Sequence, residues 1–277
     1  MAIIHVEYLS EALMRTIPVE VILPVDKLRF PGMPEREEKP FKTLYLLHGV
    51  FGSSKDWLIN TNIQRLADEK NLAVVMPCGE NRFYIDQKEG HNLYGEFIGK
   101  ELVSMTRKMF PLSHKREDTY IAGLSMGGYG ALRNGLKYHE TFGAIAALSA
   151  ALITDGIEKR TDTHPFFLET KSFAEQIFGD LNTVKGSDKD PYALVDDLIL
   201  NGNEIPHLYL ACGTDDSLLP LNQKFYEYLK QKEISVTYVE ESGNHEWDFW
   251  GRMIRKVLEW LPLEDDENGI NSGNVGL

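Results

Sequence analysis

Residues 123–127 constrain the fold of this chain more than any other feature. They read Gly-Leu-Ser-Met-Gly and match the pattern G-x-S-x-G, with Ser125 at the centre. The preceding residues 119–122 are typical of a short buried strand, and residues 128–133 of the start of a helix. A sharp turn from strand to helix at a serine is a nucleophile elbow, which exposes the hydroxyl at a helix N-terminus. The pattern therefore predicts an α/β fold in which Ser125 is a candidate nucleophile.

Strand-like and helical segments alternate along most of the chain. Besides an antiparallel opening, apolar runs predict strands at 43–47, 73–76, 119–122, 144–148, 207–211 and 236–239. Amphipathic segments predict helices at 62–70, 94–110, 221–232 and 247–260. Such alternation favours a mostly parallel, doubly wound sheet, and together with the elbow it predicts an α/β-hydrolase fold.

Two segments depart from this alternation. Residues 151–204 are polar with helical patches, and we expect them to form an insertion over the strand ends, after the strand that follows the nucleophile helix. Residues 263–277 are rich in acidic residues, Asn and Gly and have little to bury, which predicts a disordered tail. The prediction is one α/β-hydrolase domain over residues 1–262.

Composition narrows the classes of partner. The 277 residues carry a formal charge of −13 without a basic run, which disfavours nucleic acids and anionic membranes. No stretch has the length of a membrane span, and the N-terminus has no basic, apolar leader, so a cytoplasmic location is expected. Metal-ligand spacings and nucleotide-binding motifs are absent, so we expect no metal and no cofactor. The expected partner is a small molecule, and a homo-oligomer is compatible with the sequence.

A serine nucleophile needs a general base and a carboxylate, which in this fold follow the serine in the order Ser, Asp or Glu, His. His245 lies between the last predicted strand and the last helix, where the base is expected. After the penultimate strand, Asp215 and Asp216 compete. The pattern G-x-x-D-x-x-[VL]-P, ending at Pro220, favours Asp216. If neither served, Asp155 would be the next candidate.

The oxyanion hole requires two backbone N–H donors. Met126, directly after the nucleophile, is expected to supply one. The turn His48-Gly49-Val50-Phe51 follows the 43–47 strand and should supply the other from Val50, with Phe51 as the alternative. His48 precedes Ser125 in the chain, which favours a structural role for it over that of the base.

Four residues are candidates for binding substrate: Phe51, Trp57, Tyr84 and His91. Tyr84 and His91 lie on the loop after the 73–76 strand, on the same edge of the sheet as Ser125, although ordinary packing of that loop is an open alternative. Trp57 could wall the acyl pocket or belong to the core. Residues 247–250 include two tryptophans and a phenylalanine near helical spacing, which favours the core.

The motifs together resemble a known family. They are Leu46-Leu47-His48-Gly49, Trp57, Thr61-Asn62-Ile63, Ala73-Val74-Val75-Met76-Pro77, Gly123-Leu124-Ser125-Met126-Gly127-Gly128, Gly213-Thr214-Asp215-Asp216 and His245-Glu246-Trp247. From about residue 3 to 262 the chain resembles the putative esterase family, in particular its tributyrin esterase branch, with S-formylglutathione hydrolases and feruloyl esterases as relatives. The resemblance implies cofactor-free hydrolysis of short-chain acyl, acetyl-sugar or hydroxycinnamoyl esters.

The primary hypothesis is a serine carboxylesterase. An S-formylglutathione thioesterase is the first alternative, although a chain of charge −13 would not attract its anionic substrate electrostatically. An acyltransferase that excludes water and a non-catalytic scaffold are the others, and the complete set of candidate catalytic residues disfavours the scaffold.

Overall fold

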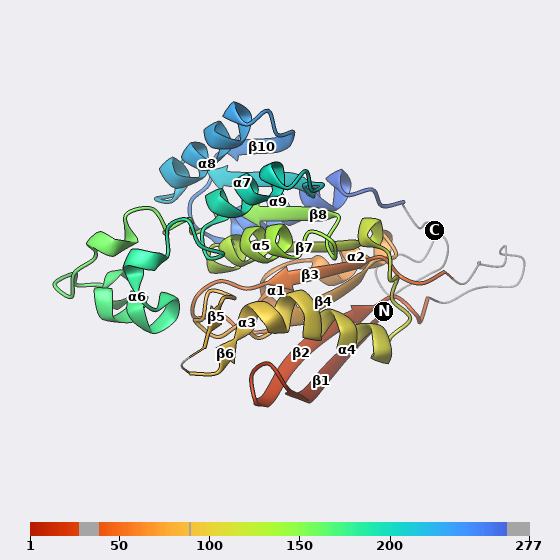
Figure 1. Ribbon diagram of the computed structural model, residues 1–277. Coiled ribbons are helices and arrows are strands. Elements are labelled where there is room, and N and C mark those ends of the chain that lie inside the picture. Colours follow the sequence, from red (N-terminus) through yellow and green to blue (C-terminus); the bar gives the residue numbers. More distant parts are fainter. Residues whose placement is uncertain (28–38, 89, 265–277) are drawn as a thin grey trace, which may run out of the picture.

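A computed structural model of the chain describes residues 1–27, 39–88 and 90–264. An eight-stranded sheet in the order β1-β2-β4-β3-β7-β8-β9-β10 runs through its centre (Figure 1). Its strands are β1 (Ala2–Ser10), β2 (Arg15–Leu23), β3 (Thr43–Leu47), β4 (Ala73–Pro77), β7 (Thr119–Leu124), β8 (Ala144–Leu148), β9 (His207–Gly213) and β10 (Val236–Glu241). The strands from β4 to β10 pair in parallel, and β1 and β2 are antiparallel. The predicted α/β-hydrolase architecture is confirmed, whereas nearly all of the predicted tail lies outside the described residues.

Helices cover both faces of the sheet (Figure 1). They are α1 (Asp56–Asn60), α2 (Ile63–Glu69), α3 (Tyr94–Glu96), α4 (Leu102–Met109), α5 (Met126–Lys137), α6 (Lys171–Phe178), α7 (Pro191–Leu200), α8 (Leu219–Gln231) and α9 (Trp247–Trp260). Successive side chains of β3 point to opposite faces of the sheet and so enter two separate cores. Leu44 and Leu46 lie in the core under α1, α2 and α9. Tyr45 and Leu47 lie in the core under α5, α7 and α8. Continuous apolar strands therefore follow from a sheet that is buried on both sides.

The helix expected at 94–110 is interrupted. It consists of α3, a π-helical turn over Phe97–Glu101, and α4. The hairpin strands β5 (Asp86–Gln87) and β6 (Asn92–Leu93), which the sequence did not predict, precede it. A 3-10 turn over Arg116–Asp118 then leads into β7.

The segment between β8 and β9 has two parts. Residues 151–183 contain the 3-10 turns Ile157–Lys159, Phe167–Glu169 and Leu181–Thr183 together with α6, and project beyond the sheet (Figure 1). The second part, α7, packs along α5 in the helical layer. Its N-cap Asp190 accepts a hydrogen bond from the Tyr192 N–H, and Pro191 occupies the first turn.

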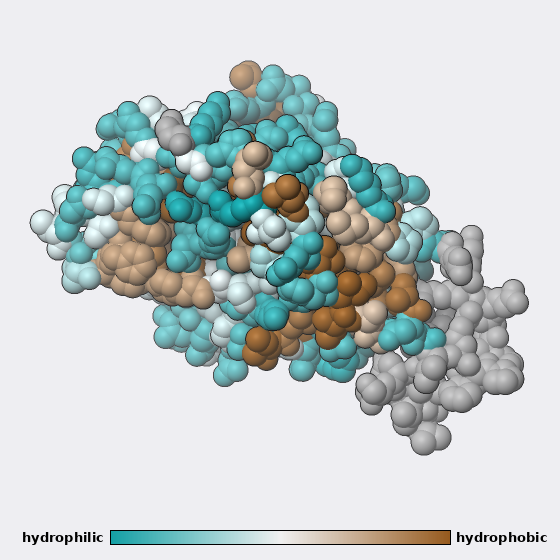
Figure 2. Space-filling view, turned by 90° about the horizontal axis from the view of Figure 1, so that it is seen from below, coloured by the Kyte–Doolittle hydropathy of each residue, from teal (hydrophilic) through white to brown (hydrophobic). Residues whose placement is uncertain are grey.

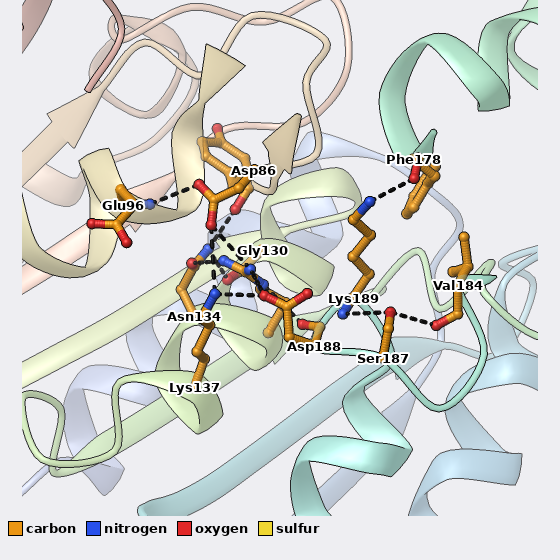
Figure 3. Close-up of polar contacts among 12 residues, drawn as sticks. Asp86, Glu96, Gly130, Asn134, Lys137, Phe178, Val184, Ser187, Asp188 and Lys189 are labelled. Atoms are coloured by element: carbon orange, nitrogen blue, oxygen red, sulfur yellow. Dashed lines mark hydrogen bonds and ion pairs between the residues drawn. The ribbon is translucent and has the colours of Figure 1, made fainter. Parts of the chain in front are cut away.

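A cluster of charges around the buried Arg133 ties this segment to α5, the helix that follows Ser125 (Figure 3). The Arg133 guanidinium pairs with Asp188, whose side chain is 42% exposed, at 2.5 Å and with Asp86 of the hairpin strand β5 at 3.3 Å. Lys137 pairs with the same two carboxylates, and the Tyr129 hydroxyl donates to the Lys189 carbonyl oxygen. Three segments far apart in the sequence are thus held together by one helix.

Replacing Arg133 by methionine is expected to lower the free energy of unfolding by about 2 kcal/mol, because Asp86 and Asp188 keep the charge of Lys137 but lose the charged hydrogen bonds of the buried guanidinium. Burial by itself would raise the pKa of Asp188, but the charge of Arg133 and the Lys137 ammonium outweigh burial and hold the pKa below its usual value. The stabilisation is therefore present at neutral pH and is lost as the pH falls below about 4.

Urea unfolding of the wild type and of Arg133→Met at pH 7 and at pH 3.5 tests this prediction. The lower pH lies below the ordinary carboxyl pKa of about 4. The difference in free energy of unfolding between the two proteins should be smaller at pH 3.5 than at pH 7. Arg65→Met is the matched control, since Arg65 forms an exposed ion pair with Glu69 one turn along α2. It should change stability by less than about 1 kcal/mol. Equal effects of the two substitutions would contradict a stabilising role for the cluster around Arg133.

The face seen from the side of the β1–β2 hairpin is largely hydrophilic, with apolar side chains gathered over these strands and in a second area at the left of the view (Figure 2). Leu9 and Met14, at the tip of the hairpin, are each 70% exposed. Across the described ranges, no helix combines the length and apolar character needed to cross a membrane.

Candidate active site

Ser125 sits between the end of β7 and the start of α5 in strained backbone. Its φ is 53° and its ψ −118°, a conformation that a non-glycine residue adopts rarely. A Cβ on Gly123 would lie 2.4 Å from the Gly127 carbonyl oxygen, and one on Gly127 would lie 2.5 Å from that of Leu47. The two glycines of the motif are thus required by close backbone approach, and the turn is the elbow that the sequence predicts.

A chain of two hydrogen bonds links Ser125 to the loops after β10 and β9. The distance from Ser125 Oγ to His245 Nε2 is 3.0 Å, and that from His245 Nδ1 to Asp216 Oδ2 is 2.8 Å. An ionised Asp216 can only accept, so Nδ1–H donates to it and Nε2 is left to accept the Ser125 hydroxyl proton. The structure therefore brings together the three residues expected to act as nucleophile, base and orienting carboxylate, in the geometry that proton transfer from Ser125 requires.

Asp216 is held as an anion in a buried position. Burial raises its pKa, but the hydrogen bonds from His245 and from the Leu218 N–H outweigh burial and lower the pKa below its usual value. Asp215 is exposed, and its carboxylate accepts only from the neighbouring Thr214 hydroxyl among the described residues. Asp155, the fallback candidate, pairs with Lys185 and Lys224. The geometry thus favours Asp216 over both alternatives.

Two backbone N–H groups remain available beside Ser125. Within the described ranges, no acceptor faces the N–H of Val50 or of Met126, whereas the Phe51 N–H donates to Asn81 Oδ1 at 2.8 Å. A Cβ on Gly49 would lie 3.5 Å from the Ser125 Cβ, so this turn touches the elbow. The geometry favours Val50 over Phe51 as the second donor to an oxyanion.

His48 supports that turn. Its Nε2 accepts from the Gly79 N–H at 2.8 Å, so Nδ1 carries the proton and donates to the Gly49 carbonyl oxygen at 2.7 Å. Burial lowers the pKa of His48, which keeps the ring neutral. Nε2 thus ties the loop after β3 to the loop after β4, while Nδ1 braces the turn itself, so both ring nitrogens have structural partners.

A cleft of about 410 Å³ opens above Ser125. It is lined by Gly49, Val50, Phe51, Asp56, Phe83, Leu124, Ser125, Met126, Ala151, Ile153, Arg160, Phe166, Leu168, Glu169, Ser217, Leu218, His245, Trp247 and Trp250. Most of these follow the carboxyl ends of β3, β4, β7, β8, β9 and β10, where ligands bind in open α/β sheets. The lining is mainly apolar, and Phe51 at the mouth is 64% exposed.

Three of the four residues expected to bind substrate lie elsewhere. Trp57 is core, with its indole N–H donating to the Leu47 carbonyl oxygen at 3.0 Å. Tyr84 is fully buried and donates to the His48 carbonyl oxygen at 3.0 Å. His91 is exposed on the β5–β6 hairpin and does not line the cleft. Of the four, Phe51 has the expected place, since Trp57 and Tyr84 are held in the interior by bonds to carbonyl oxygens and His91 lies away from the cleft on the hairpin.

The residues that sequence reasoning missed come from α9 and from residues 151–169. Trp250 is a core residue, 6% exposed, as expected, yet it also lines the cleft together with the partly buried Trp247, and the two rings meet edge to face at 5.3 Å. Phe166 and Leu168 line the cleft as well, and Arg160 supports them by donating to the Leu168 carbonyl oxygen and pairing with Glu169. The periodicity of α9 marks an apolar face but does not tell which end of that face borders a cleft.

The sheet order, the elbow and the position of the cleft define an α/β-hydrolase. A family model described as "Putative esterase" matches residues 10–261. An acetyl esterase of Caldicellulosiruptor saccharolyticus is 43% identical over 266 residues, which cover 96% of this chain and all of that protein. The chain belongs to the putative esterase family, as its motifs predict, and is a carboxylic ester hydrolase.

Two solved structures from Staphylococcus aureus agree with this assignment. S-formylglutathione hydrolase (FrmB) is 33% identical with a TM-score of 0.80, and the fluorophosphonate-binding serine hydrolase FphF is 32% identical with a TM-score of 0.82. Each comparison covers 94% of this chain and 98% of the other.

Proposed function

We propose that this protein is a serine carboxylesterase that hydrolyses small, uncharged short-chain acyl or aryl esters through an acyl-enzyme. The observation that carries the proposal is the hydrogen-bond chain from Ser125 through His245 to Asp216, at 3.0 and 2.8 Å, at the base of an apolar cleft. Nucleophile, base and orienting carboxylate in this order activate a serine hydroxyl for acyl transfer.

In the first half-reaction, Ser125 Oγ attacks the ester carbonyl carbon while its proton passes to His245 Nε2. The Val50 and Met126 N–H groups stabilise the tetrahedral oxyanion, and the ionised Asp216 stabilises the imidazolium. The intermediate collapses as His245 protonates the leaving alcohol, which forms the acyl-enzyme. Water then attacks the acyl carbonyl with His245 as base, which releases the acid and regenerates Ser125.

The character of the cleft supports an uncharged ester. Its volume of about 410 Å³ suits a small molecule, and its charged lining residues are Asp56, Glu169 and Arg160, of which the last two pair with each other. The similarity to an acetyl esterase favours a short acyl group. The similarity to an S-formylglutathione hydrolase supports thioester hydrolysis as the second candidate, although that substrate is anionic and meets an acidic protein.

A substrate panel tests the proposal: p-nitrophenyl acetate, butyrate and decanoate, methyl ferulate and S-formylglutathione. We expect kcat/KM for acetate and butyrate to exceed that for decanoate by about tenfold or more, because methylenes that find no room in a pocket lose about 1–3 kcal/mol. Hydrolysis without an added acceptor alcohol would argue against an acyltransferase. A kcat/KM for S-formylglutathione above that for every ester would replace the proposal by the thioesterase.

A further inference from the structure

One carboxylate in the lining of the cleft has an oxygen without a partner. Asp56 is the first residue of α1 and lines the cleft. Its Oδ1 accepts hydrogen bonds from the Ser53 N–H and from the Ser53 hydroxyl, both at 3.0 Å. Among the described residues, no donor and no cation pairs with Oδ2. The two bonds to Oδ1 fix the orientation of the carboxylate, so Oδ2 has a defined position as well.

Asp56 is also the charge of the cleft that has no counterpart in the lining. The other charged lining residues, Arg160 and Glu169, pair with each other at 3.2 Å. A carboxylate oxygen accepts hydrogen bonds and cannot donate them. An apolar group laid against Oδ2 would remove its water without replacing the hydrogen bond, whereas a donor would replace it. Asp56 therefore favours a ligand that carries a donor at this point.

The free oxygen lies against the turn that supplies the candidate oxyanion donor. A Cβ on Gly52 would collide with Asp56 Oδ2, and the Gly52 N–H closes the turn by donating to the Gly49 carbonyl oxygen at 3.3 Å. At its other end, the turn touches the elbow at Ser125. Val50 lies within this turn, so a substrate held by the Val50 N–H rests on the turn whose far end contacts Oδ2.

Three tryptophans connect the first turn of α1 with the candidate base. The ring of Trp57 in α1 meets that of Trp247 edge to face at 5.3 Å, and the Trp247 ring meets that of Trp250 in the same way. The indole N–H of Trp250 donates to Ser149 Oγ at 3.1 Å, and its ring meets the His245 ring with the centroids 4.9 Å apart. The first turn of α1 therefore lies on the same side of the cleft as His245.

This side of the cleft decides which half of an ester Asp56 contacts. In the proposed mechanism His245 protonates the leaving alcohol, so the alcohol occupies the side formed by α1 and α9. Phe83, Met126 and Ala151 line the cleft from the core on the other face of the sheet, which leaves that side to the acyl group. Asp56 thus faces the alcohol.

We propose that Asp56 is a specificity-determining residue, whose free oxygen accepts a hydrogen bond from a second hydroxyl group on the leaving alcohol. The inference rests on the proposed function and names the alcohol that this function prefers, an uncharged alcohol with a donor beyond the ester oxygen. The same oxygen disfavours an alcohol whose corresponding group can only accept, such as an ether or a carboxylate, because two acceptors would face each other.

The test compares acetate esters of matched shape in the wild type and in Asp56→Asn. 2-Hydroxyethyl acetate has a hydroxyl where propyl acetate has a methyl group, and 2-methoxyethyl acetate has an ether oxygen where butyl acetate has a methylene. In Asp56→Asn the amide oxygen stays with the Ser53 N–H, so the NH₂ group takes the place of Oδ2 and can donate.

Two ratios of kcat/KM should change in opposite directions in Asp56→Asn. We expect the ratio of hydroxyethyl to propyl acetate to fall about fivefold, the difference between a charged and a neutral hydrogen-bond partner. The ratio of methoxyethyl to butyl acetate should rise about fivefold, because the ether oxygen gains a donor. The intrinsic reactivities of the esters cancel, since each ratio is compared between proteins.

Two further variants separate the position of the oxygen from its charge. Asp215→Asn removes the same charge from an exposed loop residue that does not line the cleft, and both ratios should change less than about twofold. Asp56→Glu keeps the charge but moves the carboxylate by one methylene away from its place beside Ser53. In this variant the hydroxyethyl ratio should fall, while the methoxyethyl ratio stays low because no donor is gained. Should Asp56→Asn fail to fold, Asp56→Glu carries the test.

The outcomes distinguish this inference from the function on which it rests. Wild-type protein that hydrolyses none of the four acetates would overturn the proposed function and the inference with it. Hydrolysis by the wild type, with a hydroxyethyl ratio that keeps its wild-type value in every folded Asp56 variant, would overturn the inference alone. Opposite changes of the two ratios in Asp56→Asn would support it, because a general loss of activity would leave both ratios unchanged.

Discussion

Replacing Ser125 by alanine is expected to reduce kcat for ester hydrolysis by on the order of 10⁶, with only the oxyanion donors and substrate binding left to act on water. The side chain is small and sits in an elbow whose backbone is held by neighbours. The Ser125 N–H donates to the Leu148 carbonyl oxygen, and its own carbonyl oxygen accepts from Ala151. The fold should therefore remain intact, which circular dichroism and thermal unfolding would verify.

Labelling by a fluorophosphonate should disappear together with activity in Ser125→Ala. Ser104→Ala is the matched control, because Ser104 lies on the exposed face of α4 and should leave both labelling and turnover unchanged. Activity of Ser125→Ala above about one per cent of wild type would exclude Ser125 as the nucleophile, because loss of a nucleophilic serine leaves far less than this.

Asp216→Asn is expected to cost about 10⁴ in kcat, the size seen when a triad aspartate becomes an amide. The amide NH₂ cannot accept from Nδ1–H at 2.8 Å, so His245 would adopt the other tautomer and present a proton, not a lone pair, to Ser125. The measurement is kcat for p-nitrophenyl butyrate at neutral pH, where the lowered pKa keeps the wild-type carboxylate ionised.

Asp215→Asn is the adjacent control. Its carboxylate is exposed and reaches only the neighbouring Thr214 hydroxyl among the residues the structure describes, so we expect less than about a twofold change, as for an ordinary surface substitution. If Asp215→Asn were the more damaging of the two, the assignment of the carboxylate from the spacing to Pro220 would be wrong by one residue.

Local patterns predicted the parts of the site that depend on backbone geometry. The elbow at Ser125 needs glycines at fixed positions because Cβ atoms at 123 and 127 would collide with carbonyl groups. Loops after parallel strands converge at one edge of the sheet, so the order of Ser125, Asp216 and His245 along the chain indicated that the three would meet. These features follow from short segments and from the handedness of their connections.

Side chains beyond that framework were predicted less well. Tyr84, on the loop after β4, and Trp57, in α1, both point into the interior, where their polar atoms donate to the carbonyl oxygens of His48 and Leu47. The reverse holds for Trp247 and Trp250 of α9, for which the sequence favours the core although both line the cleft. A helical period of apolar residues is the same whether the face is covered by a sheet or borders a cleft.

The sequence by itself determined the α/β-hydrolase framework, the elbow and the chain positions of the residues that meet at it, because these depend on local backbone sterics and on strand order. Only the tertiary structure decided the walls of the cleft and the hydrogen bond from Trp250 to Ser149. Phe166 and Leu168 lie about forty residues beyond Ser125, and Trp250 lies 101 residues from Ser149. Such contacts arise from the packing of distant segments, whose partners no local pattern encodes.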